Sequence, residues 1–198
     1  MRLIGKGAEA ELREGRFITE GVVVKNRIEK KYRIKEIDVP LRKKRTKIEA
    51  RLLSAAKKAR VKVPLIYGLG EFEITMMRIE GKLLRDARAT PLLLKLAGTY
   101  LARLHNLSII HGDYTPANLM VDSKGELFVI DFGLGSFSKD LEDKAVDILL
   151  MKKALGDEKQ YRTFLKGYET ESKEFGRVMG QLTEVEKRGR YVVRAMQG

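Results

Sequence analysis

HGDYTPAN, residues His111–Asn118, is followed thirteen residues later by DFG, residues Asp131–Gly133. The first stretch places a histidine, an aspartate two positions on, and an asparagine five positions after that aspartate on one short loop. In such a loop Asp113 can accept the proton of an attacking hydroxyl, and Asn118 can coordinate Mg²⁺. We therefore expect Asp113 to be the catalytic base and His111 to brace the loop through hydrogen bonds.

The segment between these two motifs is typical of a β-hairpin. The strands Leu119–Val121 and Leu127–Ile130 flank the turn Asp122–Gly125. Asp131 follows the second strand directly, so the hairpin brings it toward Asn118. We expect both residues to be magnesium ligands at the phosphates of a bound nucleotide, which predicts ATP-dependent phosphoryl transfer.

A glycine-containing loop near the N-terminus lies between two expected strands, Arg2–Gly5 and Glu9–Leu12. Glycines at this point allow backbone N–H groups to close over phosphates. The pattern is weak alone, because Ala10 stands where a third glycine is expected and an ordinary β-turn is the alternative. The residues of this loop that we expect to contact ATP are Gly5, Lys6, Gly7, Ala8, Glu9 and Ala10.

Lys25 lies near the end of the apolar, β-branched strand Val22–Arg27. A lysine there can reach into a cleft and hold nucleotide phosphates if a carboxylate orients it. Glu49 is the natural partner, because it is the one acid among the nine basic residues of Arg42–Arg60. The alternative is that Glu49 only balances the local charge.

The charge of the chain is concentrated in its first third. The 198 residues include 40 basic and 27 acidic side chains, a net charge of +13. Residues 1–60 hold 19 basic and 8 acidic side chains, whereas residues 61–198 hold 21 and 19. A field of this size attracts phosphate polymers such as RNA. The alternative is a solvated basic helix without a partner.

The composition excludes several classes of protein. Without cysteine there is no disulfide framework and no thiolate metal site, and the presence of only two histidines argues against a histidine-built zinc site. The longest apolar stretch, Pro91–Leu94, is ended by Lys95, so we expect no membrane span. Arg2 and Lys6 are not followed by an apolar run, so we expect no signal peptide and a cytoplasmic protein.

The expected elements predict an α+β chain, and the motifs of a phosphoryl-transfer site within it indicate a minimal bilobal, protein-kinase-like fold. We expect residues 1–78 to form a small β-rich lobe and residues 79–198 a truncated helical lobe. The main expected features are a turn at Glu14-Gly15, a helix over Pro40–Ala59, a strand over Glu71–Met77, a helix over Leu92–His105 that starts at Thr90-Pro91, a helical pattern from Lys139 to about Met179, and a polar, basic tail over Glu184–Gly198.

The C-terminal part is too short for an ordinary protein kinase. Pro116 is the last proline, so no A-P-E motif follows Asp131, and 65 residues remain after Gly133. Gly112 stands where an arginine would clasp a phosphorylated activation loop, and Thr115 stands where many protein-serine kinases carry a lysine. We therefore expect no activation-loop switch.

Over nearly its whole length the chain resembles the small atypical kinase subunit of the KEOPS complex. The residues that carry the resemblance are Gly5–Ala10, Val23–Lys25, Lys31–Arg33, Asp38, Leu41, Arg45, Glu49, His111–Asn118, Asp131–Gly133 and Glu142–Asp147. The resemblance implies a two-lobed kinase fold related to the Rio and aminoglycoside kinases. It also implies an ATP-dependent, non-specific serine/threonine protein kinase and ATPase. Such a protein is expected to regulate the threonylcarbamoyl-transferase subunit of KEOPS, and so support threonylcarbamoyladenosine formation next to the tRNA anticodon.

The resemblance also assigns roles to residues. Lys25 and Glu49 are implied to be the phosphate-holding pair. Met77 and Ile79 are implied to bind adenine through backbone groups at the hinge, with Met76 as gatekeeper. The basic tail Lys187–Arg194 is implied to contact tRNA and other KEOPS subunits. The charge of the basic helix separately predicts a tRNA contact there.

Two other functions compete with this interpretation. A small-molecule kinase of the aminoglycoside type shares the H-G-D motif, but it usually needs a longer, acidic C-terminal region. A catalytically dead tRNA-binding module fits the charge, but Lys25, Asp113, Asn118 and Asp131 are all intact.

Overall fold

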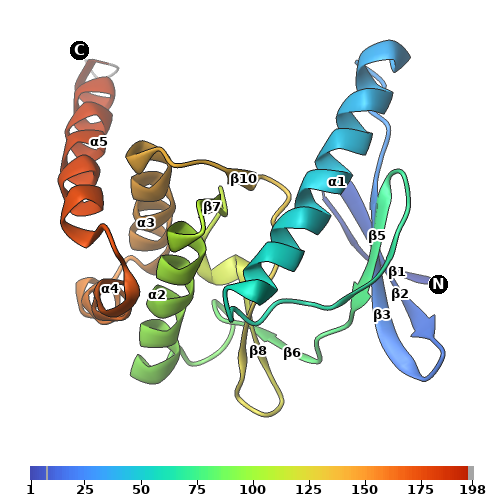
Figure 1. Ribbon diagram of the computed structural model, residues 1–198, viewed down its shortest axis with the longest axis horizontal. Coiled ribbons are helices and arrows are strands. Elements are labelled where there is room, and N and C mark those ends of the chain that lie inside the picture. The colour runs from blue at the N-terminus through green and yellow to red at the C-terminus, as the bar shows by residue number, and fades with distance from the viewer. Residues whose placement is uncertain (8, 196–198) are drawn as a thin grey trace.

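A computed structural model describes residues 1–7 and 9–195, with side chains described as far as residue 188. An antiparallel sheet lies on the right of Figure 1 and a group of helices on the left. The strands of this sheet are β1 (Arg2–Lys6), β2 (Ala10–Phe17), β3 (Glu20–Arg27), β4 (Ile66–Leu69) and β5 (Glu73–Met77). They lie in the order β1-β2-β3-β5-β4, so the strand of Lys25 is central.

The predicted turn at Glu14-Gly15 is wrong, because β2 continues through both residues to Phe17. Gly15 pairs with Val22 of β3. The hydrogen bonds between the two strands keep Gly15 extended although glycine has no side chain to pack. The chain reverses instead after Phe17, where Ile18 adopts a left-handed conformation with φ of 58°. A β-branched residue is rare in that conformation, so the residue types at this point do not predict a turn.

A long helix, α1 (Lys35–Lys58), packs beside the sheet and begins five residues before the predicted start at Pro40. Its first turn is not marked by apolar spacing, because the residue that it buries is the charged Asp38, and Pro40 is itself typical of a helix start. The carboxylates of Glu36 and Asp38 lie in that first turn, where they favour the positive end of the helix dipole.

Two small antiparallel sheets, one of three strands and one of two, come after the five-stranded sheet in the chain. The strands β6 (Gly81–Leu83), β8 (Leu119–Asp122) and β9 (Leu127–Val129) pair in the order β6-β8-β9, and β7 (Ile109–Ile110) pairs with β10 (Ser136–Phe137). A 3-10 turn, η1 (Pro116–Asn118), precedes β8. The β8–β9 pairing confirms the predicted hairpin between the two motifs.

The rest of the chain is helical. The helices are α2 (Pro91–Asn106), α3 (Leu141–Leu155), α4 (Glu158–Glu171) and α5 (Phe175–Ala195). The side-chain oxygen of Thr90 accepts a hydrogen bond from the N–H of Leu93, which confirms the predicted helix start. The helical pattern was predicted to end near Met179, but α5 continues to Ala195.

Helices α2 and α4 cross at glycines. A Cβ added at Gly167 would lie 1.8 Å from the carbonyl oxygen of Lys95, and one at Gly98 would lie 2.0 Å from that of Phe164. The two backbones can therefore approach this closely only without side chains at these positions.

One apolar core joins α1 to the helices. Leu52 and Leu53 of α1 are buried in the same cluster as Leu101 and Leu104 of α2 and Ile109 of β7. Burial of this kind contributes roughly 1.5–3 kcal/mol per large aliphatic side chain. The core therefore holds α1, and with it Glu49, in a defined position relative to the loop His111–Asn118, the predicted catalytic loop.

No helix in the described residues is long and apolar enough to span a membrane. The division into lobes at residue 78 stays a prediction, although the five-stranded sheet ends at Met77.

Candidate active site

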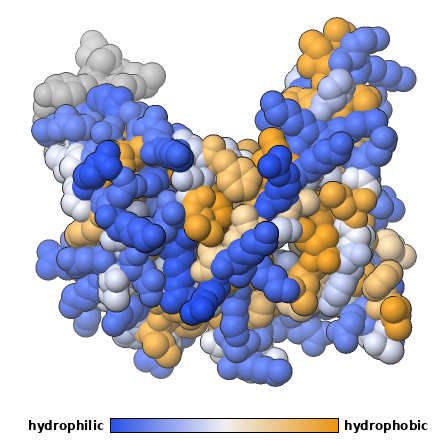
Figure 2. Space-filling view, viewed as in Figure 1, coloured by the Kyte–Doolittle hydropathy of each residue, from blue (hydrophilic) through white to orange (hydrophobic). Residues whose placement is uncertain are grey.

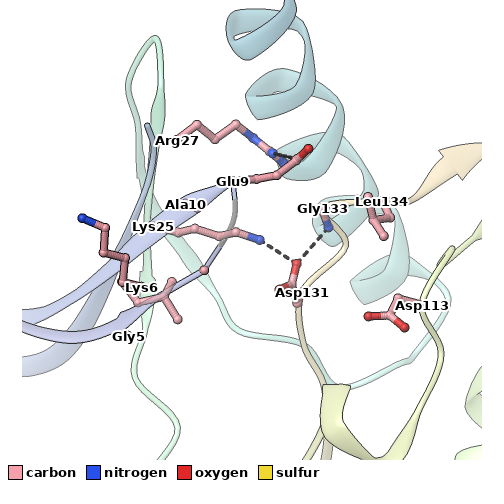
Figure 3. Close-up of a pocket in the computed structure, with 12 residues that line it drawn as sticks. Gly5, Lys6, Glu9, Ala10, Lys25, Arg27, Asp113, Asp131, Gly133 and Leu134 are labelled. Carbon is pink, nitrogen blue, oxygen red and sulfur yellow. Dashed lines mark hydrogen bonds and ion pairs between the residues drawn. The ribbon is translucent and has the colours of Figure 1, made fainter. Parts of the chain in front are cut away.

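A cavity of about 530 Å³ lies between the β1–β2 loop, β3 and the segment after β9. Figure 3 shows Asp131 facing Lys25, while Asp113 lies across the cavity from Gly5 and Lys6. The residues that line it are Gly5, Lys6, Gly7, Glu9, Ala10, Leu12, Lys25, Arg27, Asp113, Asp131, Gly133 and Leu134. Most of the predicted ATP-contacting residues are thus brought together from both motifs and from the glycine loop.

Lys25 is held between two carboxylates. Its Nζ lies 2.6 Å from Oε1 of Glu49 and 2.6 Å from Oδ1 of Asp131. The side chain of Glu49 is only 2% exposed, so Glu49 is a buried partner of Lys25 rather than a surface charge balancer. Because the pair is buried, loss of one partner would leave an uncompensated charge, which costs about 3–5 kcal/mol.

Arg27 is a further charged residue of this site that the sequence analysis missed. Its Nη2 donates to Oε2 of Glu49 at 2.6 Å, and its Nη1 donates to Oε2 of Glu9 at 3.4 Å. Only 4% of Arg27 is exposed. The sequence does indicate this position, because residues two apart on a strand point to the same face and Arg27 follows Lys25 by two.

Glu9 ties the glycine loop to α1. Its carboxylate accepts hydrogen bonds from the guanidinium of Arg45 and from Arg27. The hydrogen bond from Arg45, with the positive charges of Arg45 and Arg27, lowers the pKa of Glu9 although partial burial opposes this. An ionised Glu9 therefore holds this loop over the cavity.

Asp131 adopts a left-handed backbone conformation, with φ of 60°. Burial disfavours its charge, but the Lys25 ammonium and the N–H of Gly133, 3.1 Å from Oδ1, outweigh burial and lower the pKa of Asp131. The side chain remains 51% exposed, so the ionised carboxylate can still be reached from the cavity. This is the state that a divalent cation requires of a ligand.

The amide of Asn118 is oriented by Asp113. Its Nδ2 donates to the backbone carbonyl and to Oδ2 of Asp113, both at 2.8 Å. Both donors of the amide are thereby used, and among the described residues none donates to its Oδ1. An amide oxygen and the ionised carboxylate of Asp131 are both oxygen ligands of the kind that Mg²⁺ prefers, so the chemistry of Asn118 and Asp131 fits the predicted metal site.

Asp147 of α3 holds the backbone of the loop His111–Asn118 in place. This fully buried carboxylate accepts the N–H of His111 at Oδ2 and the N–H of Gly112 at Oδ1, both at 2.8 Å. His111 in turn donates from Nε2 to the carbonyl of Ile130 at 3.0 Å, and its Nδ1 accepts from the N–H of Asp113 at 3.3 Å. His111 therefore braces the loop, as predicted, and Asp147 is a positioning residue inside the run Glu142–Asp147.

A second buried histidine contacts the same carboxylate. His105 lies with Nε2 3.2 Å from Oδ2 of Asp147 and with Nδ1 2.8 Å from the hydroxyl of Tyr168. A carboxylate only accepts hydrogen bonds, so Nε2 carries the proton and Nδ1 accepts from Tyr168. Burial lowers the pKa of His105, although Asp147 opposes this change, so the folded protein holds the ring neutral.

We therefore expect the free energy of unfolding to decrease as the pH falls from about 7.5 to 5.5. The unfolded chain takes up a proton on His105 near its ordinary pKa of about 6.5, whereas the folded chain does so only at lower pH. Urea unfolding at a series of pH values measures this, with His105→Gln as the comparison. An equally steep pH dependence in the variant would contradict the assignment to His105.

Gly112 allows the catalytic loop to pack on the segment after Gly133. Its φ is 79°, and a Cβ there would lie 2.4 Å from the carbonyl oxygen of Leu134. This close approach leaves no room for the arginine expected of an ordinary protein kinase. It gives a physical reason for the glycine in the H-G-D motif.

We expect Gly112→Ala to lower the melting temperature and to reduce ATP turnover. Gly125 provides a matched control, because its φ is also 79° but a Cβ there meets no atom within 4 Å. Gly125→Ala should cost only the left-handed strain of about 1–2 kcal/mol and leave ATP turnover unchanged. Equal effects of the two substitutions on both measurements would refute the close-contact explanation.

Several predicted residues do not line the cavity. Glu49 binds the lining residue Lys25, and Asn118 binds the lining residue Asp113, but neither lines the cavity itself. Met77 and Ile79 are also absent from its lining; the N–H of Met77 donates to Leu65 at 2.8 Å. The hinge assignment therefore stays a prediction. Ala8 and the side chains of residues 189–198 in the basic tail lie outside the described part of the chain.

The comparisons with known proteins agree with this geometry. The chain matches the ABC1 atypical kinase-like domain over residues 28–164. It is 40% identical, over 97% of both chains, to the probable serine/threonine-protein kinase BUD32 homolog of Archaeoglobus fulgidus. It is 42% identical, over 96% of its own length, to a probable bifunctional tRNA threonylcarbamoyladenosine biosynthesis protein of Methanobrevibacter smithii, of which it spans 36%.

Solved structures show the same fold at much lower identity. The Rio2 kinase of Chaetomium thermophilum in its ADP/Mg²⁺-phosphoaspartate complex superposes with a TM-score of 0.62 at 15% identity, covering 95% of this chain and 70% of that one. Another Rio2 structure from this organism gives a TM-score of 0.65. These similarities confirm the predicted α+β, bilobal kinase-like fold. The chain belongs to the Bud32 family of atypical serine/threonine protein kinases.

Proposed function

We propose that this chain is an ATP-dependent serine/threonine kinase and ATPase that binds ATP and Mg²⁺ in the cavity of Figure 3. The observation that carries the proposal is the position of Lys25, whose Nζ lies 2.6 Å from both Glu49 and Asp131 at the wall of this cavity. A buried cation so oriented suits the phosphates of a nucleotide.

The other residues supply the remaining requirements of phosphoryl transfer. The glycine loop lines the cavity and is tied to α1 by the bond between Glu9 and Arg45, so it would lie over the phosphates. Asp113 accepts the proton of the attacking hydroxyl, from a serine, a threonine or water, and Asn118 keeps its carboxylate in place at 2.8 Å. Held by Asn118 and Asp131, Mg²⁺ would neutralise charge on the phosphates. Adenine would extend beyond the lining of this cavity to the backbone at Met77 and Ile79.

The biological context of this chemistry comes from the relatives. The bifunctional relatives join a region that this chain matches to a further region, and their names place them in tRNA threonylcarbamoyladenosine biosynthesis. We infer that this chain acts with a threonylcarbamoyl-transferase partner and other KEOPS subunits, and that ATP turnover regulates this assembly on tRNA.

ATP turnover by the purified chain, alone and with the transferase partner and tRNA, tests the proposal. We expect Mg²⁺-dependent phosphate release that increases when partner and tRNA are added. No stimulation by either would overturn the regulatory role. Rapid phosphorylation of an aminoglycoside in place of any response to the partner would favour the small-molecule kinase instead.

A further inference from the structure

The nine basic residues of Arg42–Arg60 fall into two groups in the structure. The first group is used inside the protein. Arg42 donates from Nε to Asp38 at 2.6 Å and stacks on Phe72, with its guanidinium carbon 4.1 Å from the ring centroid. Lys43 pairs with Glu71 at 2.6 Å, and Arg45 binds Glu9 of the glycine loop. The charges of these three cations are therefore partly offset by acids of the chain itself.

The second group includes a row on one face of α1, which we call the α1 cationic stripe: Lys44, Lys47, Arg51 and Lys58. Steps of three, four and seven residues place them one above another on a helix. All four are exposed, and none makes an ion pair with any residue that the structure describes. The stripe extends for about 21 Å at 1.5 Å per residue. Figure 2 shows hydrophilic side chains along the visible face of α1 down to the centre of the molecule.

Both ends of the stripe reach hollows in the surface. Lys44 lines a hollow of about 260 Å³ beside Gly133 and Leu134, next to the mouth of the ATP cavity. Lys58 lines a hollow of about 390 Å³ on the helical part of the chain. The lining of this second hollow also holds Arg60 and Lys173, and Arg103, which pairs with the carboxylate of Glu171 there at 3.0 Å. Cations therefore outnumber acids where α1 meets the residues just after α4.

An exposed aromatic ring lies beside the middle of the stripe. Phe137 of β10 is 49% exposed, and the guanidinium carbon of Arg51 lies 5.9 Å from its ring centroid. An aromatic face next to cations can stack an unpaired base, and base stacking on such rings is sequence-tolerant.

The chemistry of this surface favours RNA over a protein partner. Protein interfaces have an apolar core and are depleted in lysine, whereas three of the four residues in the stripe are lysines and the turn between Arg51 and Lys58 presents Ser54. Nucleic-acid interfaces are strongly positive, and their affinity comes largely from phosphate contacts. We propose that the α1 cationic stripe binds the phosphate backbone of RNA, with Phe137 stacking an unpaired base. The identity of this RNA as tRNA rests on the proposed function.

The test is binding of a transcribed tRNA to the full chain over a series of salt concentrations. In the stripe variant Lys44→Gln/Lys47→Gln/Lys58→Gln, we expect the slope of log K against log salt to fall by about 2–3, since each phosphate contact contributes about 0.7–0.9. The matched control Lys153→Gln/Lys159→Gln/Lys166→Gln removes the same charge from exposed positions of α3 and α4, and should leave the slope nearly unchanged. Phe137→Ala should weaken binding without changing the slope.

The outcomes separate this inference from the proposed function. The stripe variant should keep the ATP turnover of the chain measured without RNA, because none of its residues touches the catalytic groups. An unchanged salt slope, or equal losses in stripe variant and control, would overturn the stripe as an RNA site even if ATP turnover is normal. Loss of transferase binding with unchanged tRNA binding would assign the surface to an acidic protein partner and also overturn the inference.

Discussion

Asp131→Ala is expected to reduce Mg²⁺-dependent ATP turnover to the background rate. The carboxylate of Asp131 pairs with Lys25 at 2.6 Å, is held by Gly133 and remains half exposed toward the cavity. Its pKa is lowered, because Lys25 and the Gly133 N–H outweigh the opposing effect of burial, so it is ionised at neutral pH and suited to a divalent cation. Alanine removes the proposed metal ligand, while Glu49 still holds Lys25 in place.

Phosphate release from ATP at saturating Mg²⁺ measures this effect. The control is Asp86→Ala, which removes a carboxylate whose side chain is 59% exposed and paired only with Arg85 among the described residues. Asp86→Ala should keep the wild-type rate, and both variants should show cooperative thermal unfolding. Wild-type activity in a folded Asp131→Ala protein would refute the metal assignment.

Asp113→Asn is expected to lower the rate of phosphoryl transfer by roughly 10²–10⁴-fold, the range for loss of a general base. The substitution keeps the size of the side chain, and an amide oxygen at this position can still accept the hydrogen bond that Asn118 now donates at 2.8 Å. An amide cannot take a proton from the attacking hydroxyl. The affinity for ATP should therefore change little, because no residue that holds the phosphates is altered.

Single-turnover transfer and equilibrium nucleotide binding separate the two effects. Asp86→Asn carries the same change of charge at an exposed position and should match the wild type in both measurements. If Asp113→Asn reduces ATP affinity and transfer by the same factor, Asp113 is a binding residue rather than the base.

The sequence predicts the geometry of the candidate site best where its residues are close together in the chain. His111–Asn118 and the β8–β9 hairpin are contiguous, so their spacing alone indicates that Asp113, Asn118 and Asp131 come from one continuous segment. The pairing of Lys25 with Glu49 crosses 24 residues, but a lone acid in a basic helix identifies the partner.

Contacts without such a local signal were missed. Asp147 reaches the N–H of His111 across 36 residues, and the run that contains it indicates no partner for it. Arg27 could have been noticed by its position two residues after Lys25, but the acids that it binds lie on the glycine loop and on α1.

Charge density in a sequence likewise does not show which cations are used internally. Arg42 and Lys43 are neighbours of Lys44 in the chain, yet they bind Asp38 and Glu71, whereas Lys44 lies on the exposed stripe. The direction in which each side chain leaves the helix decides this difference. It depends on where the core places α1, and the core is formed by residues far away in the sequence.

The most direct test of the phosphoryl-transfer site is the initial rate of phosphate release from ATP and Mg²⁺ by the wild-type chain and by Asp131→Ala, each with the transferase partner and tRNA. We expect a rate for the wild type that the partner and tRNA stimulate, and a background rate for the variant under every condition. Equal rates for the two proteins would show that the cavity around Lys25, Asp113 and Asp131 is not where ATP is turned over.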